Sequence, residues 1–350
     1  MRGLFVGALL AAVAATTVGA GDLADQFTAT AGDGVSASFF VLDNNGGTID
    51  LAGDKLDHTT PVRIASVTKT FVAATALRLV EEGKLDITQP INHYIDARFD
   101  ELLTSDGYDT SAIRVKHLLS HTGGLVDHTH GKPFFDTLLA DPTHHWTREE
   151  QVKGAVDWLD PLGEPGEKFS YSDTGYVLLG HIIEKQSGLS LAAAVRSYLA
   201  LDSFDLKNTY WELVEVNTGA EARRAHQYFQ GMDTHGWSAT LDHYGGGGLV
   251  STTEDMATFF SALFGGDVFK KEGTLDLMLS QEGLPDASPY RLGIFVYEVD
   301  GVTFYEHSGF WGTLAIYVPS QKRAIAGAVL HQKHFKAMRD AMVGLVTEGM

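Results

Sequence analysis

Two strand-like runs separated by a short polar turn near the start of the chain predict a β-hairpin. Residues 36–42 have the composition of a strand, the turn residues 44–47 follow, and residues 48–51 return as a second strand. Near the other end, four more stretches have strand-like patterns and are joined by turns, namely 292–299, 303–306, 313–318 and 324–330. The sequence therefore predicts strands at both ends of the chain.

Between these strands the hydrophobic pattern changes to helical spacing. From Ser66 to Glu82, apolar side chains recur every three or four residues, and Gly83 ends the pattern. A similar run before Gly188 predicts another helix, and Ser251 to Glu254 form a predicted capping box for a helix over 256–263. Residues 334–348 are also predicted to be helical.

Strands from both termini around a helical middle predict an α/β (α+β) fold. We expect one antiparallel sheet flanked by helices, with an inserted all-helical lobe. The α/β lobe would comprise about 34–85 and 266–350, and the helical lobe about 86–265, within a single domain over 21–350. A ligand site is expected in the crevice between the lobes.

The first 20 residues have the layout of a secretion signal. Arg2 precedes an apolar stretch from Leu4 to Val13, and the small residues Val18 to Ala20 follow. We expect cleavage near Ala20, a secreted or periplasmic protein, and no stable membrane insertion after cleavage. A membrane anchor is the alternative, but the stretch is short for a bilayer.

Composition narrows the possible chemistry. With 350 residues and 44% hydrophobic composition, the chain can form a large core. It has no cysteine, which excludes a disulfide framework, a thiolate metal site and a cysteine nucleophile. The formal charge of −19 argues against a nucleic-acid partner. A small-molecule or peptide substrate is the expected partner, and the oligomeric state stays open.

One short motif has the spacing needed for nucleophilic catalysis. Ser66-Val67-Thr68-Lys69 is the only place where a lysine follows a serine by three residues, which puts both side chains on one face of a helix. A serine hydroxyl is a weak nucleophile until a neighbouring base takes its proton, and a partly desolvated lysine can be that base. Chance also produces such a motif about once in a chain of this size, so it needs support.

Further motifs supply that support, and with them the sequence resembles a known family. Phe169 to Tyr176 includes Tyr171-Ser172-Asp173, and His307 to Gly312 includes His307-Ser308-Gly309. The class C β-lactamases, the low-molecular-weight DD-peptidases and the family VIII esterases share Ser-x-x-Lys, Tyr-x-Asn and Lys/His-x-Gly in this order. The resemblance covers about 34–332, including the family-like segments 115–125 and 246–252.

The resemblance implies roles for the matching positions. Ser66 would be the nucleophile, with Lys69 and Tyr171 handling the proton. The backbone N–H groups of Ser66 and Phe310 would form the oxyanion hole. Other residues expected at the substrate are Asp173, His307, Ser308, Gly309 and Trp311. No metal ion or organic cofactor is needed for this chemistry. The loop around His121-Thr122-Gly123 would shape the pocket rim.

Two departures from the family pattern bear on the substrate. Asp173 replaces the usual asparagine, and a carboxylate cannot donate a hydrogen bond to an amide carbonyl. It should also raise the pKa of Lys69 and shift the work of the base to Tyr171. His307 replaces the lysine of class C β-lactamases, so the fixed positive charge that holds a β-lactam carboxylate is lost, because histidine is charged only part of the time.

The favoured function is hydrolysis of a small ester or a D-alanyl-type peptide or amide through an acyl-Ser66 intermediate, with possible weak β-lactam hydrolysis. A penicillin-binding sensor that stays acylated is one alternative. A metal-dependent hydrolase is another, suggested by His128-Thr129-His130 and by His144-His145, although no His-Glu-x-x-His motif is present.

Overall fold

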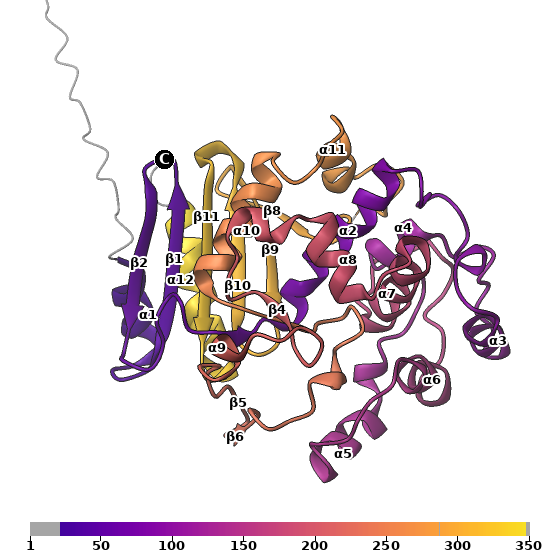
Figure 1. Ribbon diagram of the computed structural model, residues 1–350, viewed down its shortest axis with the longest axis horizontal. Coiled ribbons are helices and arrows are strands. Elements are labelled where there is room, and N and C mark those ends of the chain that lie inside the picture. Colours follow the sequence, from indigo (N-terminus) through magenta and orange to yellow (C-terminus); the bar gives the residue numbers. More distant parts are fainter. Residues whose placement is uncertain (1–21, 287, 348–350) are drawn as a thin grey trace, which may run out of the picture.

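The computed structural model describes residues 22–286 and 288–347. Its main sheet is antiparallel and six-stranded, with the order β2-β1-β11-β10-β9-β8. The strands are β1 (Ala37–Asp43), β2 (Gly46–Ala52), β8 (Phe295–Val299), β9 (Val302–Gly309), β10 (Thr313–Val318) and β11 (Arg323–Val329). The N-terminal hairpin pairs directly with β11 (Figure 1), so the predicted sheet from both termini is confirmed.

The two faces of the sheet are covered by different helices. Strand β1 alternates, because Phe39 and Val41 pack in the cluster of α1 (Leu23–Ala31) and α12 (Phe335–Thr347), whereas Phe40 packs in the larger core on the other face. On that other face, α10 (Thr253–Gly265) lies against β1, β10 and β11. The prediction that residues 253–265 belong to the inserted lobe is wrong, because their apolar face is buried on the sheet.

The inserted region holds most of the remaining helices. They are α3 (Ala97–Ser105), α4 (Val115–Leu119), α5 (Lys132–Ala140), α6 (Arg148–Trp158), α7 (Asp173–Ser187), α8 (Leu191–Tyr198) and α9 (Thr218–Glu221), with α11 (Thr274–Leu279) following α10. The region is not purely helical. Short strands β4 (Tyr210–Trp211) and β7 (Leu249–Ser251) pair with β3 (Val62–Arg63), and β5 (Tyr228–Phe229) pairs with β6 (Met232–Asp233).

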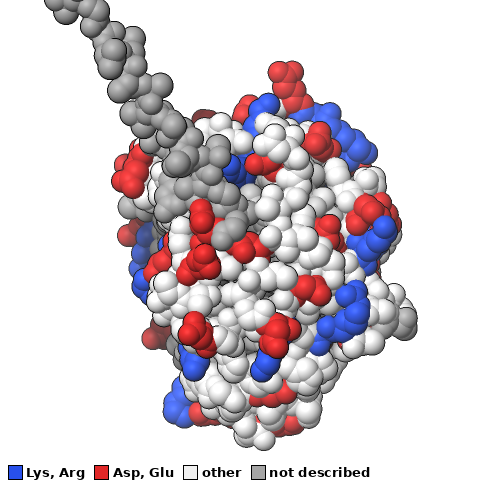
Figure 2. All heavy atoms as spheres, turned by 90° about the vertical axis from the view of Figure 1, so that its left-hand side faces the viewer, with Lys and Arg blue, Asp and Glu red and all other residues white. Residues whose placement is uncertain are grey.

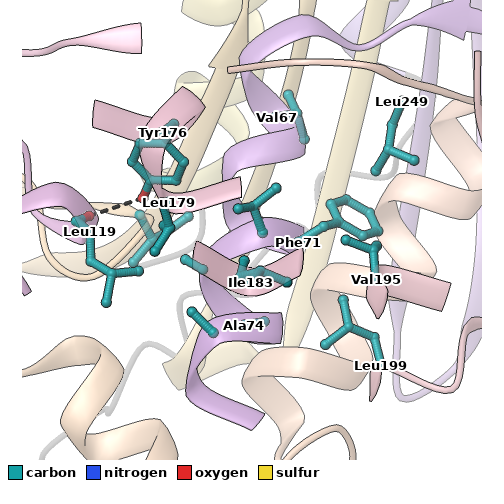
Figure 3. Close-up of a cluster of buried hydrophobic side chains, with 14 of the residues drawn as sticks. Val67, Phe71, Ala74, Leu119, Tyr176, Leu179, Ile183, Val195, Leu199 and Leu249 are labelled. Carbon is teal, nitrogen blue, oxygen red and sulfur yellow. Dashed lines mark hydrogen bonds between the residues drawn. The ribbon is translucent and has the colours of Figure 1, made fainter. Parts of the chain in front are cut away.

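Helix α2 (Thr68–Glu81) is the buried axis of the molecule. Thirteen of its 14 residues are buried, so the predicted buried helix is confirmed. Phe71 and Ala74 lie among apolar side chains of α7 and α8, such as Ile183 and Val195 (Figure 3). Because α2 is enclosed on all sides, the residues at its start are held rigidly.

The predicted capping box of α10 is displaced by one residue. The N-cap is Thr252, whose side chain accepts a hydrogen bond from the N–H of Asp255. Ser251 is the last residue of β7, where its backbone pairs with Val62, and its hydroxyl lies 2.8 Å from that of Thr209. Strand pairing therefore excludes Ser251 from the capping position.

The export of the protein remains a prediction. The predicted secretion signal, residues 1–20, lies outside the described residues. Within the described part, no helix is both long and apolar enough to cross a bilayer. Figure 2 shows acidic and basic side chains scattered over the face near α1 and β2. On the described part of that face, lysine and arginine do not gather into a continuous patch.

Candidate active site

Ser66 lies in the 3-10 turn η2 (Ala65–Val67), immediately before α2. The preceding residue, Ala65, has a φ of 43°, a left-handed conformation that is strained for alanine. The Nζ atom of Lys69, one turn into the buried helix, donates to the Ser66 Oγ at 2.9 Å. The predicted pairing of the two side chains is therefore present in the structure, and a strained turn presents the serine.

Lys69 is fully buried and held as an ammonium. Its Nζ lies 2.5 Å from Asp173 Oδ1 and donates to the carbonyl oxygen of Gly246 at 2.5 Å. Burial lowers the pKa of Lys69, but the charge of Asp173, with a further contribution from Tyr171, outweighs burial and raises the pKa above its usual value. The predicted effect of Asp173 on Lys69 is thus present in the structure.

Tyr171 completes the cluster around Ser66. Its ring centroid lies 5.0 Å from the lysine Nζ, and both the ammonium of Lys69 and the hydroxyl of Ser66 lower the pKa of its phenol. Burial raises the pKa of Tyr171 to about 12, although the positive charge of Lys69 opposes that rise. The phenol is therefore protonated at neutral pH, next to a cation that stabilises its ionised form.

His121 supports Tyr171 from behind. Its ring centroid lies 4.2 Å from that of Tyr171, and its Nδ1 accepts a hydrogen bond from the N–H of Ser172 at 3.1 Å. Burial and the charge of Lys69 hold the pKa of His121 well below its usual value, so the ring is neutral. The loop had been expected at the pocket rim, but His121 is only 3% exposed and packs beneath the tyrosine.

His307 is also neutral, which sharpens the expectation that it is partly charged. The hydroxyl of Tyr290 donates to its Nε2 at 2.9 Å, and its Nδ1–H donates to the carbonyl of Ser308 at 3.0 Å. Burial and the nearby Lys69 lower the pKa of His307 to about 3. Both ring nitrogens are satisfied by a single uncharged tautomer, so His307 brings no positive charge to the site.

The strand that carries His307 passes very close to the segment before Ser66. A Cβ placed on Gly309 would lie 2.1 Å from the carbonyl oxygen of Ile64, so only glycine fits there. The hydroxyl of Thr313 donates to the same oxygen at 3.1 Å. This close approach brings Phe310, the residue after Gly309, to the same cavity as Ser66.

These residues border a cavity of about 590 Å³. The larger apolar part of the lining, which we call the apolar wall, consists of Phe134, Phe135, Leu138, Leu241, Phe295 and Phe310. Ser66 and Tyr171 also line the cavity, as do the predicted substrate residues Asp173, His307, Ser308 and Trp311. Gly309 is not at the surface of the cavity and acts through the close approach of its strand.

Two acidic residues of the cavity, Asp127 and Asp242, were not predicted as site residues. Neither belongs to one of the motifs that carry the resemblance. The run of glycines from 245 to 248 was the available signal, because a Cβ on Gly247 would lie 2.3 Å from the Oδ2 of Asp242. The close approach of Gly247 to Asp242 exists only in the folded chain.

The histidines that suggested a metal site do not come together. His128 is buried, with its Nδ1 3.1 Å from the hydroxyl of Thr174, and His144 contacts Glu150 at 3.2 Å. Among the described residues, no group of three or more histidine, aspartate or glutamate side chains has the arrangement of a metal site. The pattern of neighbouring histidines therefore has a structural explanation in local hydrogen bonds.

The class of protein follows from the fold and from comparison with known families. A buried helix with a serine and lysine at its start, enclosed between a sheet and a helical region, is typical of the serine β-lactamase and transpeptidase fold. The family model described as Beta-lactamase matches residues 23–345. The chain belongs to this family.

Individual relatives share less than a third of their aligned residues with this chain. Penicillin-binding protein 4* of Bacillus subtilis is 28% identical over 229 residues, which cover 59% of this chain and 46% of that protein. The chain spans half or less of the length of the curated relatives it matches.

Two solved structures are similar in fold over nearly the whole chain. A D-stereospecific amidohydrolase from Streptomyces sp. has a TM-score of 0.76 at 23% identity, covering 90% of this chain and 96% of that chain. The D-amino acid amidase from Ochrobactrum anthropi SV3 has a TM-score of 0.74 at 21% identity, covering 93% and 97%.

Proposed function

We propose that the protein is a secreted serine hydrolase that forms an acyl-enzyme on Ser66 and acts on a small ester or amide. The observation that carries the proposal is the contact among Ser66, Lys69 and Tyr171 at the wall of an open, mostly apolar cavity. A hydroxyl nucleophile, a cation and a proton acceptor in mutual reach make up the machinery of acyl transfer.

The protonation states divide the work between Lys69 and Tyr171. Because Asp173 keeps Lys69 charged, the amine cannot take the proton from Ser66 in the resting site. Tyr171, which is protonated in the resting site, would first release its proton to solvent. The phenolate so formed, stabilised by the ammonium of Lys69, would take the proton of Ser66 as the serine oxygen attacks the substrate carbonyl. Tyr171 then returns the proton to the leaving group, and a water molecule releases the acyl group by the same route in reverse.

The oxyanion of this reaction would be stabilised by backbone donors. Both Ser66 and Phe310 border the cavity, and the close approach at Gly309 holds their two segments together. Two N–H groups that converge on one carbonyl oxygen contribute several kcal/mol to such reactions, about 3 for each donor. This supports the assignment of these N–H groups as the oxyanion hole.

Two features of the site disfavour β-lactams as the main substrate. The neutral His307 offers no charge to a carboxylate, and the cavity is lined by three aspartates. The amidases of similar fold, one of them solved with phenylalanine amide, favour a small amide or ester instead. A protein that binds penicillin and stays acylated is the second candidate, supported by its relative Penicillin-binding protein 4*.

Intact-protein mass spectrometry tests the acyl-enzyme directly. The protein is mixed with p-nitrophenyl butyrate, a D-Ala-D-Ala peptide or a fluorescent penicillin while turnover is followed in parallel. We expect a transient adduct with one ester or amide substrate, and at least about a 10³-fold loss of turnover in Ser66→Ala. Ser203→Ala, which alters an exposed serine in the turn Leu201–Phe204, is the matched control.

The possible outcomes separate the two candidates. A stable penicillin adduct without turnover of any substrate would favour the sensor. Turnover that survives in Ser66→Ala would contradict the mechanism. Export is tested separately by expressing the full chain with its first 20 residues and sequencing the N-terminus of the exported protein, which we expect to begin near residue 21.

A further inference from the structure

Among the described residues, three aspartates and no lysine or arginine line the cavity beside Ser66. Two of the three have partners. Asp173 is paired with Lys69, and Asp127 accepts hydrogen bonds from the N–H and the hydroxyl of Thr129 at 2.9 and 2.8 Å. The Lys69–Asp173 pair is neutral as a unit, so the negative charge of the cavity comes from Asp127 and from the ionised form of Asp242.

Asp242 differs from the other two aspartates because its carboxylate has no hydrogen bond or ion pair with any described residue. Arg63 is the cation whose charge lowers the pKa of Asp242 most. The guanidinium of Arg63 is already occupied, since it forms two bonds to Glu212 and donates to the carbonyls of Thr234 and Trp237. Asp242 therefore keeps its bonding capacity for something in the cavity.

The position of Asp242 is built into the glycine run. A Cβ on Gly246 would meet the carboxyl carbon of Asp173 at 3.3 Å, and a Cβ on Gly247 would meet the Oδ2 of Asp242 at 2.3 Å. The two carboxylates thus pack on consecutive glycines, and the carbonyl of Gly246 also accepts from Lys69. This arrangement places Asp242 beside the catalytic cluster and not at a remote edge of the cavity.

We propose that the acyl part of the substrate carries a protonated amine, which the carboxylate of Asp242 binds, next to an aryl or alkyl group on the apolar wall. The inference rests on the proposed function of Ser66. An ammonium would give Asp242 the partner that the described residues do not supply, and a partly buried carboxylate without a partner is less stable than a paired one. The apolar wall accounts for the remaining surface of such a substrate.

The same charges act against acyl groups that carry a carboxylate. A carboxylate in the cavity would face Asp127 and Asp242. The ring of His307 is neutral and both of its nitrogens are already hydrogen-bonded, so it offers such a group no compensating charge. Discrimination by charge is therefore the property to measure.

Kinetics with three substrates of one skeleton test the proposal. They are phenylalanine p-nitroanilide, in both enantiomers, its N-acetyl derivative and its N-succinyl derivative, whose main forms near pH 7 are positive, neutral and negative. We expect kcat/KM for the better amine enantiomer to exceed that of the neutral compound by at least about 10-fold, and the negative compound to be slowest. In Asp242→Asn the ratio of amine to neutral substrate should fall by about 10-fold.

A matched variant controls for the change in net charge. Asp340 lies on α12, on the far side of the sheet, where it pairs with Lys336 on the same helix. Asp340→Asn should leave the ratio of amine to neutral substrate unchanged. A ratio near one in the wild type, or a ratio that falls equally in both variants, would overturn the proposal.

A binding measurement separates this proposal from the proposed function. Calorimetric titration of Ser66→Ala with 2-phenylethylamine and with 3-phenylpropionate requires no chemistry. We expect the amine to bind at least about 10-fold more tightly than the acid, and to weaken by a similar factor in Ser66→Ala/Asp242→Asn.

The two measurements fail in different ways. If turnover depends on Ser66 but the acid binds as well as the amine, the amine site is wrong and the proposed function stands. If the amine binds through Asp242 but a fluorophosphonate forms no adduct with Ser66 of the wild type, the proposed function is wrong, and with it the role of Asp242 in a substrate site.

Discussion

Two carboxylates near Arg63 lie in contrasting environments. Glu212 receives two hydrogen bonds from Arg63, at 2.7 and 3.0 Å, and lies 3.4 Å from Arg224. Asp242, on the cavity side, has no partner among the described residues. Burial raises the pKa of both groups, but the arginines outweigh burial at Glu212, whose pKa is lowered, whereas the pKa of Asp242 rises to about 7.

The difference arises because the buried arginines Arg63 and Arg224 pair with Glu212 and not with Asp242. Arg63 connects β3 to the loop before β7 through Glu212, Thr234 and Trp237, which stabilises the fold. Using Arg63 in this way leaves Asp242 unpaired and the cavity negative. Glu212 therefore stabilises the fold, whereas Asp242 remains available to bind a ligand.

The largest expected effect is the loss of the paired carboxylate. Glu212→Gln leaves Arg63 and Arg224 buried without a counter-charge, and should lower the free energy of unfolding by about 3 kcal/mol at pH 7. Because the folded pKa of Glu212 is depressed, its contribution is present above its usual value of 4.5 and is lost as the pH falls below the folded value. Urea unfolding at pH 7 and pH 4 measures both effects, and an equal loss at both would contradict the assignment.

Next in size is the effect of Asp173→Asn on the pH profile of hydrolysis. Without the carboxylate, burial alone would depress the pKa of Lys69, so the free amine would form at lower pH and could act as the base. The rising limb of kcat/KM against pH should move down by at least about one unit, equivalent to about 1.4 kcal/mol. An unchanged limb would mean that Asp173 does not control the proton acceptor.

The contribution of Asp242 to stability should depend on pH in the opposite direction to that of Glu212. The folded pKa of Asp242 is raised, since burial, Asp173 and Glu212 outweigh Arg63 and Lys69. Its favourable contribution is therefore complete below its usual value of 3.8 and is lost as the pH rises through about 7.

Asp242→Asn should accordingly be more stable than the wild type by about 1 kcal/mol at pH 8, and by less at pH 5. Thermal unfolding at the two pH values measures the gain. A loss of stability at pH 8 would show that Asp242 has a structural partner and would weaken the contrast with Glu212.

The smallest effect is expected at a surface carboxylate. Asp340 is half exposed and its ion pair with Lys336 links positions i and i+4 of one helix. Asp340→Asn should change the free energy of unfolding by less than about 0.5 kcal/mol at either pH. A larger change would indicate that net charge, and not the local environment, controls the results for Glu212 and Asp242.

Much of the fold was predictable because its signals are local or periodic. The strands at both termini are runs of strand-forming residues bounded by turns, the buried helix after Ser66 follows helical spacing, and both are present. The position of the α10 cap was missed because strand pairing removed Ser251 from competition, and pairing is a long-range contact. The short strands of the inserted region also depend on partners far away in the sequence.

The sequence by itself determined which residues could carry the chemistry. Ser66 and Lys69 share a helical turn, and this spacing holds wherever the helix lies. Only the tertiary structure decided the charge of the site. His307 is neutral because Tyr290 donates to it in a buried place, and Asp242 is unpaired because Arg63 is taken by Glu212, 149 residues away. Charge states follow from burial and from competition for partners, and neither exists until the chain has folded.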